Sequence, residues 1–295
     1  MVRGSSVQTL QRFVYNELHM GGRVTLTLFA PDEDTAERAA RAAYGRYAAL
    51  EDVFSDYRPA SELMRLCALA GTGPVAVSAE LFDVLAFGLR VSEWTGGAFD
   101  MTASPVVRLW RTARQTGSMP PERARLLAQL LVGWRNVSLD PLLRTASLLL
   151  PGMQLDLGGI AKGYANDHAL LALKANGVDR AMVEAGGDIG VSGAPPGAQG
   201  WAIKVRGLPD TFFLSECAIS TSGDTEQFVE IGGVRYSHVV DPRTGLGVTT
   251  RVQASVIAPR GLTTDPLATA LCVDPSIERS DLSEIGASAV QIVPV

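Results

Sequence analysis

Two motifs of this 295-residue sequence carry residue types that suit phosphate and metal chemistry. The first, DLGGIAKGYAND from Asp156 to Asp167, places a carboxylate, two consecutive glycines and Lys162 at a predicted turn from strand to helix. Glycines let the backbone approach a ligand closely, and free N–H groups at the start of a helix bind phosphate. An ordinary strand-to-helix turn explains this segment alone equally well, and the dinucleotide-binding pattern GxGxxG is absent.

The second motif is TDPLATA, from Thr264 to Ala270. Its pattern predicts a helix with Asp265 as N-cap and Pro266 at the first helical position, so that Thr269 lies one turn later on the same face. A carboxylate and a hydroxyl oxygen suit Mg²⁺, which completes its octahedron with water and substrate phosphate. A bare cation beside the positive end of a helix is unfavourable, so a metal site here requires a phosphate as well. A simple capped helix is the alternative.

Further turns rich in glycine and aspartate follow predicted strands. They are GGD at 186–188, SGD at 222–224 and YSHVVDPRTG at 236–245. Such loops form the rim where ligand sites are usually built. His238 lies in the last of them, but a single histidine at a strand end is more often structural than catalytic. Spacing alone does not indicate a Ser-His-Asp triad, because triads assemble in space.

The composition excludes several classes of protein. A hydrophobic content of 46% supports a sizeable core, and a formal net charge of −5 gives no electrostatic basis for a nucleic-acid partner. Three widely spaced cysteines indicate neither a disulfide framework nor a zinc site. No apolar run reaches the roughly 20 residues of a membrane span, and no secretory signal is seen. We therefore expect a cytoplasmic protein as the sequence stands, or an extracytoplasmic one if a leader was removed.

The elements that must position these motifs are helical early and strand-rich later. A strand is predicted at 23–30 and a helix at 34–52, and Ser192 to Gly200 reads as a loop. Further helices are predicted at 61–70, 79–95 and 121–133, and strands around 137, 148–150, 181–184, 202–205, 218–221, 234–240 and 252–257. This order predicts an α+β fold, with helices packed on a largely antiparallel sheet, in a single domain over residues 1–295.

Taken together, the motifs resemble the ApbE family of FAD:protein FMN transferases over residues 20 to 273. The stretches that carry the resemblance, in order, are FSDYRPASEL from Phe54, TGGAFDMT from Thr95, LDLGGIAKGYA from Leu155, GGD from Gly186, STSGD from Ser220, YSHVVDPRTG from Tyr236 and TDPLATAL from Thr264. Seven motifs in one order are hard to produce by accident. Family members often have Thr at the position of Gly22, Asn at that of Cys67, and an exported N-terminus, and this chain departs from all three.

The resemblance implies an extended cleft for FAD, with a divalent cation near the pyrophosphate. The implied metal site comprises Asp265, Thr269 and the carbonyl of Gly159, with Ala268 lining the same turn. The implied flavin contacts are Met20, Tyr57, Ala98, Phe99, Asp100, Asp156, Lys162 and the backbone around Val240. His238 and Asp241 are the candidates for a general base.

The implied reaction is Mg²⁺-dependent transfer of FMN from FAD to a Thr or Ser hydroxyl of an acceptor flavoprotein, with release of AMP. The same residues serve an FAD pyrophosphatase, in which water replaces the acceptor. A flavin-binding protein without catalysis is a third interpretation, and it would not need Asp265 and Thr269.

Overall fold

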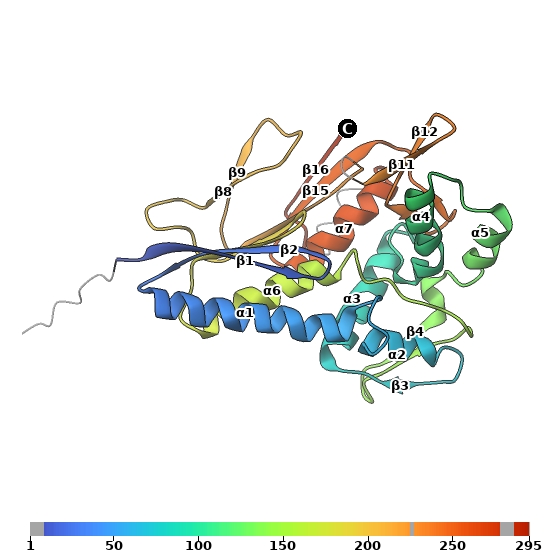
Figure 1. The fold of residues 1–295 in the computed structure, drawn as a ribbon, viewed down its shortest axis with the longest axis horizontal. Coiled ribbons are helices and arrows are strands. Elements are labelled where there is room, and N and C mark those ends of the chain that lie inside the picture. Colours follow the sequence, from blue (N-terminus) through green and yellow to red (C-terminus); the bar gives the residue numbers. More distant parts are fainter. Residues whose placement is uncertain (1–8, 225–226, 278–285, 295) are drawn as a thin grey trace, which may run out of the picture.

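A seven-stranded antiparallel sheet is the framework of the protein in the computed structural model, which describes residues 9–224, 227–277 and 286–294. Its strands run in the order β1-β2-β6-β7-β10-β15-β16, and every neighbouring pair is antiparallel (Figure 1). The strands are β1 Gln11–His19, β2 Gly22–Ala30, β6 Ala181–Ala185, β7 Asp188–Val191, β10 Cys217–Ser222, β15 Val252–Ala258 and β16 Ala289–Pro294.

The β1–β2 hairpin has a two-residue turn made by Met20 and Gly21. Both have positive φ, 50° and 76°, and His19 pairs with Gly22 across the turn. Two consecutive left-handed residues give the turn the twist that matches the flanking strands. The turn thereby fixes Met20 at the tip of the hairpin, where its N–H donates to the carboxylate of Glu51.

Three helices cover one face of the sheet: α1 Glu33–Phe54, α6 Ala161–Ala175 and α7 Gly261–Val273 (Figure 1). Two glycines bring α6 and α7 together. A Cβ on Gly163 would collide with the carbonyl oxygen of Gly261 and lie 2.9 Å from the Cβ of Asp265. Only glycine permits so close an approach of the two helices. The resulting crossing places Lys162 of α6 beside Asp265 of α7.

The opposite face of the sheet is covered by a hairpin of β8 Trp201–Lys204 and β9 Thr211–Leu214. Trp201 and Ile203 of β8 pack with Val191 and Ile219 of the sheet in a second apolar cluster. The turn-rich segment at 192–200 leads into β8 without a helix or strand of its own, as predicted.

The remaining elements surround one end of the sheet. The helices there are α2 Glu62–Ala68, α3 Ala79–Trp94, α4 Ser104–Thr116 and α5 Glu122–Gln129, with 3-10 turns at Met101–Ala103 and Trp134–Asn136. The short strands are β3 Val75–Ala76, β4 Val137–Asp140, β5 Thr145–Leu148, β11 Phe228–Ile231, β12 Val234–Ser237, β13 Val240–Asp241 and β14 Leu246–Gly247. Buried Trp110 of α4 donates its indole N–H to the carbonyl of Gly245 at 2.9 Å. This contact holds the 236–247 segment against α4.

The structure confirms the predicted α+β fold with a largely antiparallel sheet, and it corrects the predicted start of α7. This helix begins at Gly261 and not beside Asp265, so Pro266 lies inside it. Its first N–H groups are satisfied from another helix: Gly261 and Leu262 donate to the carboxylate of Asp167 at 2.7 and 3.1 Å. Local sequence cannot reveal a cap supplied by a side chain about 95 residues away.

Several further elements escaped the sequence patterns: the strands β1, β3, β7, β9, β11, β14 and β16, and helix α4. Strand β1 is an edge strand whose side chains are largely exposed, so its hydrophobic alternation is weak. Helix α4 was not predicted either, although Pro105 stands near its start and Gly117, with φ 66°, at its C-cap. In the part of the chain that the structure describes, no helix is long and apolar enough to cross a membrane.

Candidate active site

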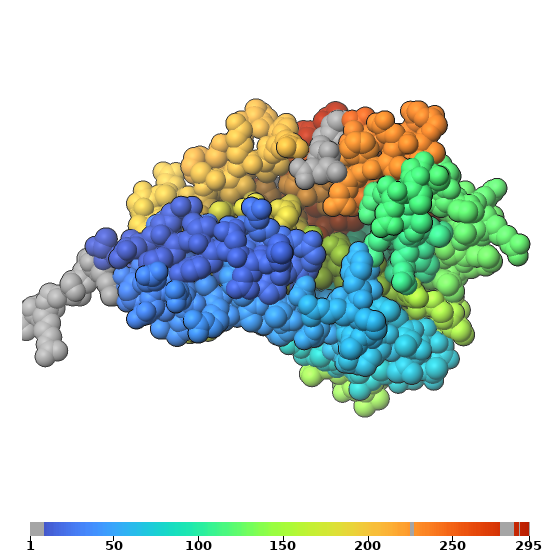
Figure 2. Space-filling view, in the orientation of Figure 1, coloured from blue at the N-terminus to red at the C-terminus, as the bar shows by residue number. Residues whose placement is uncertain are grey.

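A cavity of about 900 Å³ lies between the tip of the β1–β2 hairpin, α4, the start of α6 and the 238–242 segment. Figure 2 shows the surface hollowed between the N-terminal hairpin and α4. Twelve of the residues implied by the resemblance line this cavity: Met20, Tyr57, Ala98, Phe99, Asp100, Asp156, Gly159, Lys162, His238, Val240, Asp265 and Thr269. Segments far apart in the sequence therefore meet at one site.

The charged centre of the cavity is formed by Lys162, Asp188 and Asp265. The Lys162 ammonium pairs with Asp188 and lies 3.8 Å from an oxygen of Asp265, while the other Asp265 oxygen accepts the Gly163 N–H at 3.1 Å. Asp188 and Asp265 are 4% and 2% exposed. Burial raises the pKa of Asp265, and the neighbouring charge of Asp188 raises it further. Burial by itself would lower the pKa of Lys162, but the two carboxylates raise it.

Thr269 and Gly159 lie next to this centre, and their hydroxyl and carbonyl oxygens are further possible ligands for a cation. The Thr269 hydroxyl is 3.4 Å from that of Ser222, and a Cβ on Gly159 would lie 3.1 Å from the same Thr269 oxygen. No group of three or more His, Cys, Asp or Glu side chains is placed to hold a metal among the described residues. A cation here would therefore be held by one buried carboxylate, a hydroxyl and a backbone carbonyl, a hard-oxygen set that suits Mg²⁺ when phosphate and water fill the remaining positions.

The glycine turn places the N-terminus of α6 at the cavity. Gly158 and Gly159 line it directly before α6 begins at Ala161. The carboxylate of Asp156 fixes the turn, accepting the Gly158 N–H at 2.8 Å and pairing with Arg111 at 2.7 Å. The positive end of the helix dipole and Lys162 thus face the same space, which is favourable for phosphate.

The predicted flavin contacts lie around the wider part of the cavity. Tyr57 is 74% exposed, and the Arg111 guanidinium lies 4.9 Å from its ring centre. Ala98 and Phe99 present buried apolar surface. Asp100 lines the cavity too, but its carboxylate is used within the protein, because it accepts N–H groups of Thr102 and Trp134 at 2.8 and 2.9 Å.

The two candidates for the general base differ in their surroundings. His238 lines the cavity, and its Nδ1 lies 3.1 Å from the carbonyl of Gln227. Burial lowers the pKa of His238, and the charges of Arg114 and Lys162 lower it further. The hydrogen bond to Gln227 raises this pKa, but by less than burial lowers it. Asp241 is not among the lining residues, and both of its oxygens accept from Arg243, at 3.0 and 3.1 Å. Of these two candidates, only His238 lines the cavity, and within the described residues its Nε2 has no hydrogen-bond partner.

Ala268 also differs from its expected position. It is fully buried in the main core and is not among the residues that line the cavity. Asp188, by contrast, is a lining residue to which sequence reasoning assigned no role, although its GGD motif was noted. Arg111 and Arg114 were missed altogether. The signal for them was the spacing of positions 107, 111 and 114, which share one face of a helix once α4 is recognised.

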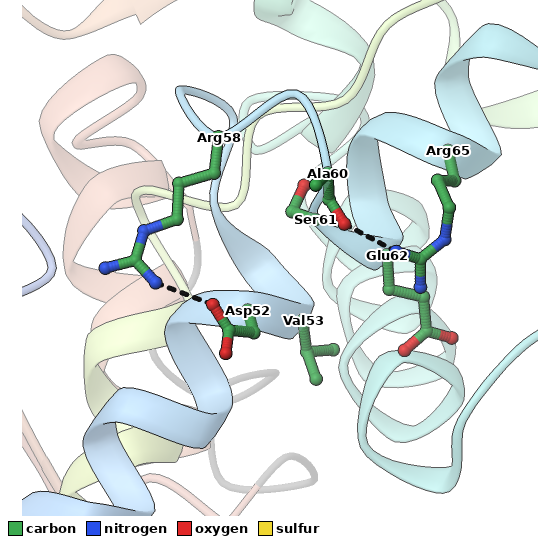
Figure 3. Close-up of a pocket in the computed structure, with 7 residues that line it drawn as sticks. All are labelled: Asp52, Val53, Arg58, Ala60, Ser61, Glu62 and Arg65. Carbon is green, nitrogen blue, oxygen red and sulfur yellow. Dashed lines mark hydrogen bonds and ion pairs between the residues drawn. The ribbon is translucent and has the colours of Figure 1, made fainter.

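A second cavity, of about 480 Å³, lies between the end of α1 and the start of α2. Figure 3 shows Arg58 reaching Asp52 and Arg65 reaching the carbonyl oxygen of Ala60. The first of these hydrogen bonds is 2.6 Å long and the second 2.5 Å. Glu62 accepts the N–H of Ser78 at 2.6 Å. These charges satisfy one another or nearby backbone groups, so the larger cavity is the candidate active site.

The chain matches the model of the ApbE family over residues 20–290. It is 36% identical to the FAD:protein FMN transferase of Treponema pallidum, over 77% of this chain and 71% of that protein. The structure resembles the ApbE protein from Thermotoga maritima, with a TM-score of 0.85 and 28% identity over 96% of this chain and 94% of that one. It also resembles the flavin transferase ApbE from Vibrio cholerae, with a TM-score of 0.83 and 26% identity over 97% and 94%. The motifs, the fold and these similarities agree, and the chain belongs to the ApbE family.

Proposed function

We propose that this chain transfers FMN from FAD to a Thr or Ser hydroxyl of an acceptor protein and releases AMP, with Mg²⁺ bound at Asp265. The observation that carries the proposal is the convergence of Lys162, Asp265 and Thr269 on the start of α6 inside one large cavity. Relatives that are named FAD:protein FMN transferases support the same reaction.

The start of α6 is the proposed site for the pyrophosphate of FAD. Gly158 and Gly159 leave room for the phosphates at the helix N-terminus. Lys162 supplies a positive charge, because the neighbouring carboxylates of Asp188 and Asp265 raise its pKa and keep its amine protonated. Preorganised charges of this kind stabilise the charge that develops on phosphorus oxygens in the transition state. The flavin would occupy the wider part of the cavity near Met20, Tyr57, Ala98 and Phe99.

Asp265, Thr269 and the carbonyl of Gly159 are the proposed ligands of the cation, while Ala268 supports that turn of α7 from the core. When bound, Mg²⁺ would neutralise pyrophosphate charge as it does in other phosphoryl transfers. Asp188 keeps Lys162 close to this carboxylate in the absence of substrate.

His238 is the proposed general base. With its Nδ1–H donating to the carbonyl of Gln227, Nε2 keeps its lone pair and accepts the proton of the acceptor hydroxyl. The hydroxyl oxygen then bonds to the phosphorus on the FMN side, and the bond from that phosphorus to the bridging oxygen breaks. AMP leaves with that oxygen.

His238→Gln is expected to lower the rate of FMN transfer by about 10²- to 10⁴-fold, the usual contribution of a general base. Because the pKa of His238 is lowered, its neutral form persists below the ordinary value of 6.5. The wild-type rate should fall only as pH drops through that lowered pKa, and the variant should lack this acid limb. Asp241→Asn is the matched comparison. A greater loss in that variant than in His238→Gln would contradict the assignment of the base.

Incubation of the protein with FAD, Mg²⁺ and an acceptor protein should yield AMP and an acceptor whose mass rises by one FMN. The acceptor is denatured before its mass is measured, and both products should be lost with EDTA. AMP without a mass gain on acceptors that a relative modifies would point to hydrolysis. Bound FAD with no AMP would point to a flavin-binding protein.

A further inference from the structure

The cavity is lined by Ala103, directly before α4, and by Val107, Arg111 and Arg114 on one face of α4. The first two, nearest the start of the helix, are small or apolar, whereas the last two are cationic. Arg111 is paired on both sides, with Asp56 at 2.5 Å and Asp156 at 2.7 Å. Its positive charge is therefore already balanced within the protein.

Arg114 differs from the other cations that line the cavity. Arg58 pairs with Glu51, Lys162 pairs with Asp188, and Arg206 is also engaged. For Arg114 the structure gives no hydrogen bond and no ion pair within the described ranges, although its side chain is half-buried. Burial lowers the pKa of Arg114, and the neighbouring charge of Arg111 lowers it further. A partly desolvated guanidinium without an anion is costly, and a ligand that supplied one would remove that cost.

The position of Arg114 indicates where such an anion would lie. Arg114 follows Arg111 by about one turn on the face of α4 that lines the cavity, and the Arg111 guanidinium lies 4.9 Å from the ring centre of Tyr57. The charge of Arg114 also lowers the pKa of His238. Tyr57 is exposed at the mouth of the cavity, and His238 is the proposed base for the incoming hydroxyl. Arg114 therefore faces the side of the cavity on which the two substrates would meet.

We propose that Arg114 binds an anionic oxygen group of a substrate beside the reacting hydroxyl. The group is either a phosphate of FAD or a carboxylate of the acceptor segment. A guanidinium presents a planar fork of donors that fits either group through two hydrogen bonds. This inference rests on the proposed function for the identity of the substrates, and it gives Arg114 a binding role that is distinct from the paired, structural role of Arg111.

The test compares Arg114→Gln with Arg108→Gln. Arg108 lies on the same helix, is exposed, does not line the cavity and donates to Gln154 at 2.6 Å. The two variants thus remove the same charge from the same helix. FAD affinity is measured by flavin fluorescence in EDTA, so that no turnover occurs, and KM for the acceptor is measured with Mg²⁺. Thermal unfolding of each variant verifies that it is folded.

A tenfold or greater loss of FAD affinity in Arg114→Gln alone would identify the anion as a phosphate. Unchanged FAD affinity with a tenfold or greater rise in acceptor KM would identify it as an acceptor carboxylate, and replacing acidic residues of the acceptor segment by amides should then remove the difference. Arg114→Lys should lose less than Arg114→Gln in either case. Equal values for Arg114→Gln and Arg108→Gln in both measurements would overturn the inference.

The outcome separates this inference from the proposed function. A wild-type protein that binds FAD but transfers no FMN contradicts the proposed function. In that case only the phosphate remains as a partner, and the FAD affinity of Arg114→Gln decides: a loss supports the inference, and no loss overturns it.

Discussion

Asp265→Asn is expected to lower the rate of FMN transfer by about 10²- to 10³-fold, the loss that follows removal of one preorganised electrostatic group in an active site. The Asp265 carboxylate is the one acidic side chain in the proposed set of metal ligands, and it also holds Lys162 at 3.8 Å. A neutral amide weakens both interactions at the pyrophosphate. AMP formation with saturating FAD and acceptor, followed across a range of Mg²⁺ concentrations, is the measurement.

Asparagine is the informative replacement because it has the shape of aspartate and can still accept the Gly163 N–H that Asp265 accepts at 3.1 Å. The variant should therefore fold, which thermal unfolding verifies. Its apparent affinity for Mg²⁺ should fall together with its rate. A variant with near-normal turnover at ordinary Mg²⁺ concentrations would contradict the assignment of Asp265 to the metal.

Gly163→Ala is expected to destabilise the protein by about 3 kcal/mol, at the upper end of the range for overpacking a well-packed site. Its Cβ would meet the backbone of Gly261 and the Cβ of Asp265, and neither belongs to a flexible side-chain end that could move aside. Separation of α6 from α7 would also move Lys162 away from Asp265. Transfer should therefore fall even at temperatures where the variant remains folded.

Gly45→Ala provides the control for this prediction. Gly45 lies in α1, is exposed, and a Cβ there would meet nothing within 4 Å. The same substitution in an open helical position should stabilise the protein by up to about 1 kcal/mol, because alanine is the better helix former. Urea unfolding of the two variants compares them directly. Similar midpoints for both would show that the α6–α7 crossing tolerates a side chain.

Much of the fold followed from the sequence because its signals are local. Helix α3 runs from Ala79 to Trp94, close to the predicted 79–95, and Ser78 caps it through the N–H of Leu81 at 3.2 Å. Helix α1 is capped in the same way by Asp32. Buried strands such as β15 are rich in apolar residues and were equally visible. Where the signal was not local, as in edge strand β1 and at the start of α7, prediction was incomplete or wrong.

The sequence by itself determined which residue types and motifs are present, and through their order it indicated the family. It could not show that Ala268 is buried away from the cavity or that Asp241 is occupied by Arg243. Nor could it show that Asp188 shares Lys162 with Asp265, or that Arg114 is left without a partner in the described part of the chain. Asp241 and Arg243 are neighbours in one turn, but Lys162 is 26 positions from Asp188 and about a hundred from Asp265. Only the tertiary structure decides these relations, because they depend on how closely α6 and α7 cross at Gly163 and on which face α4 turns toward the cavity.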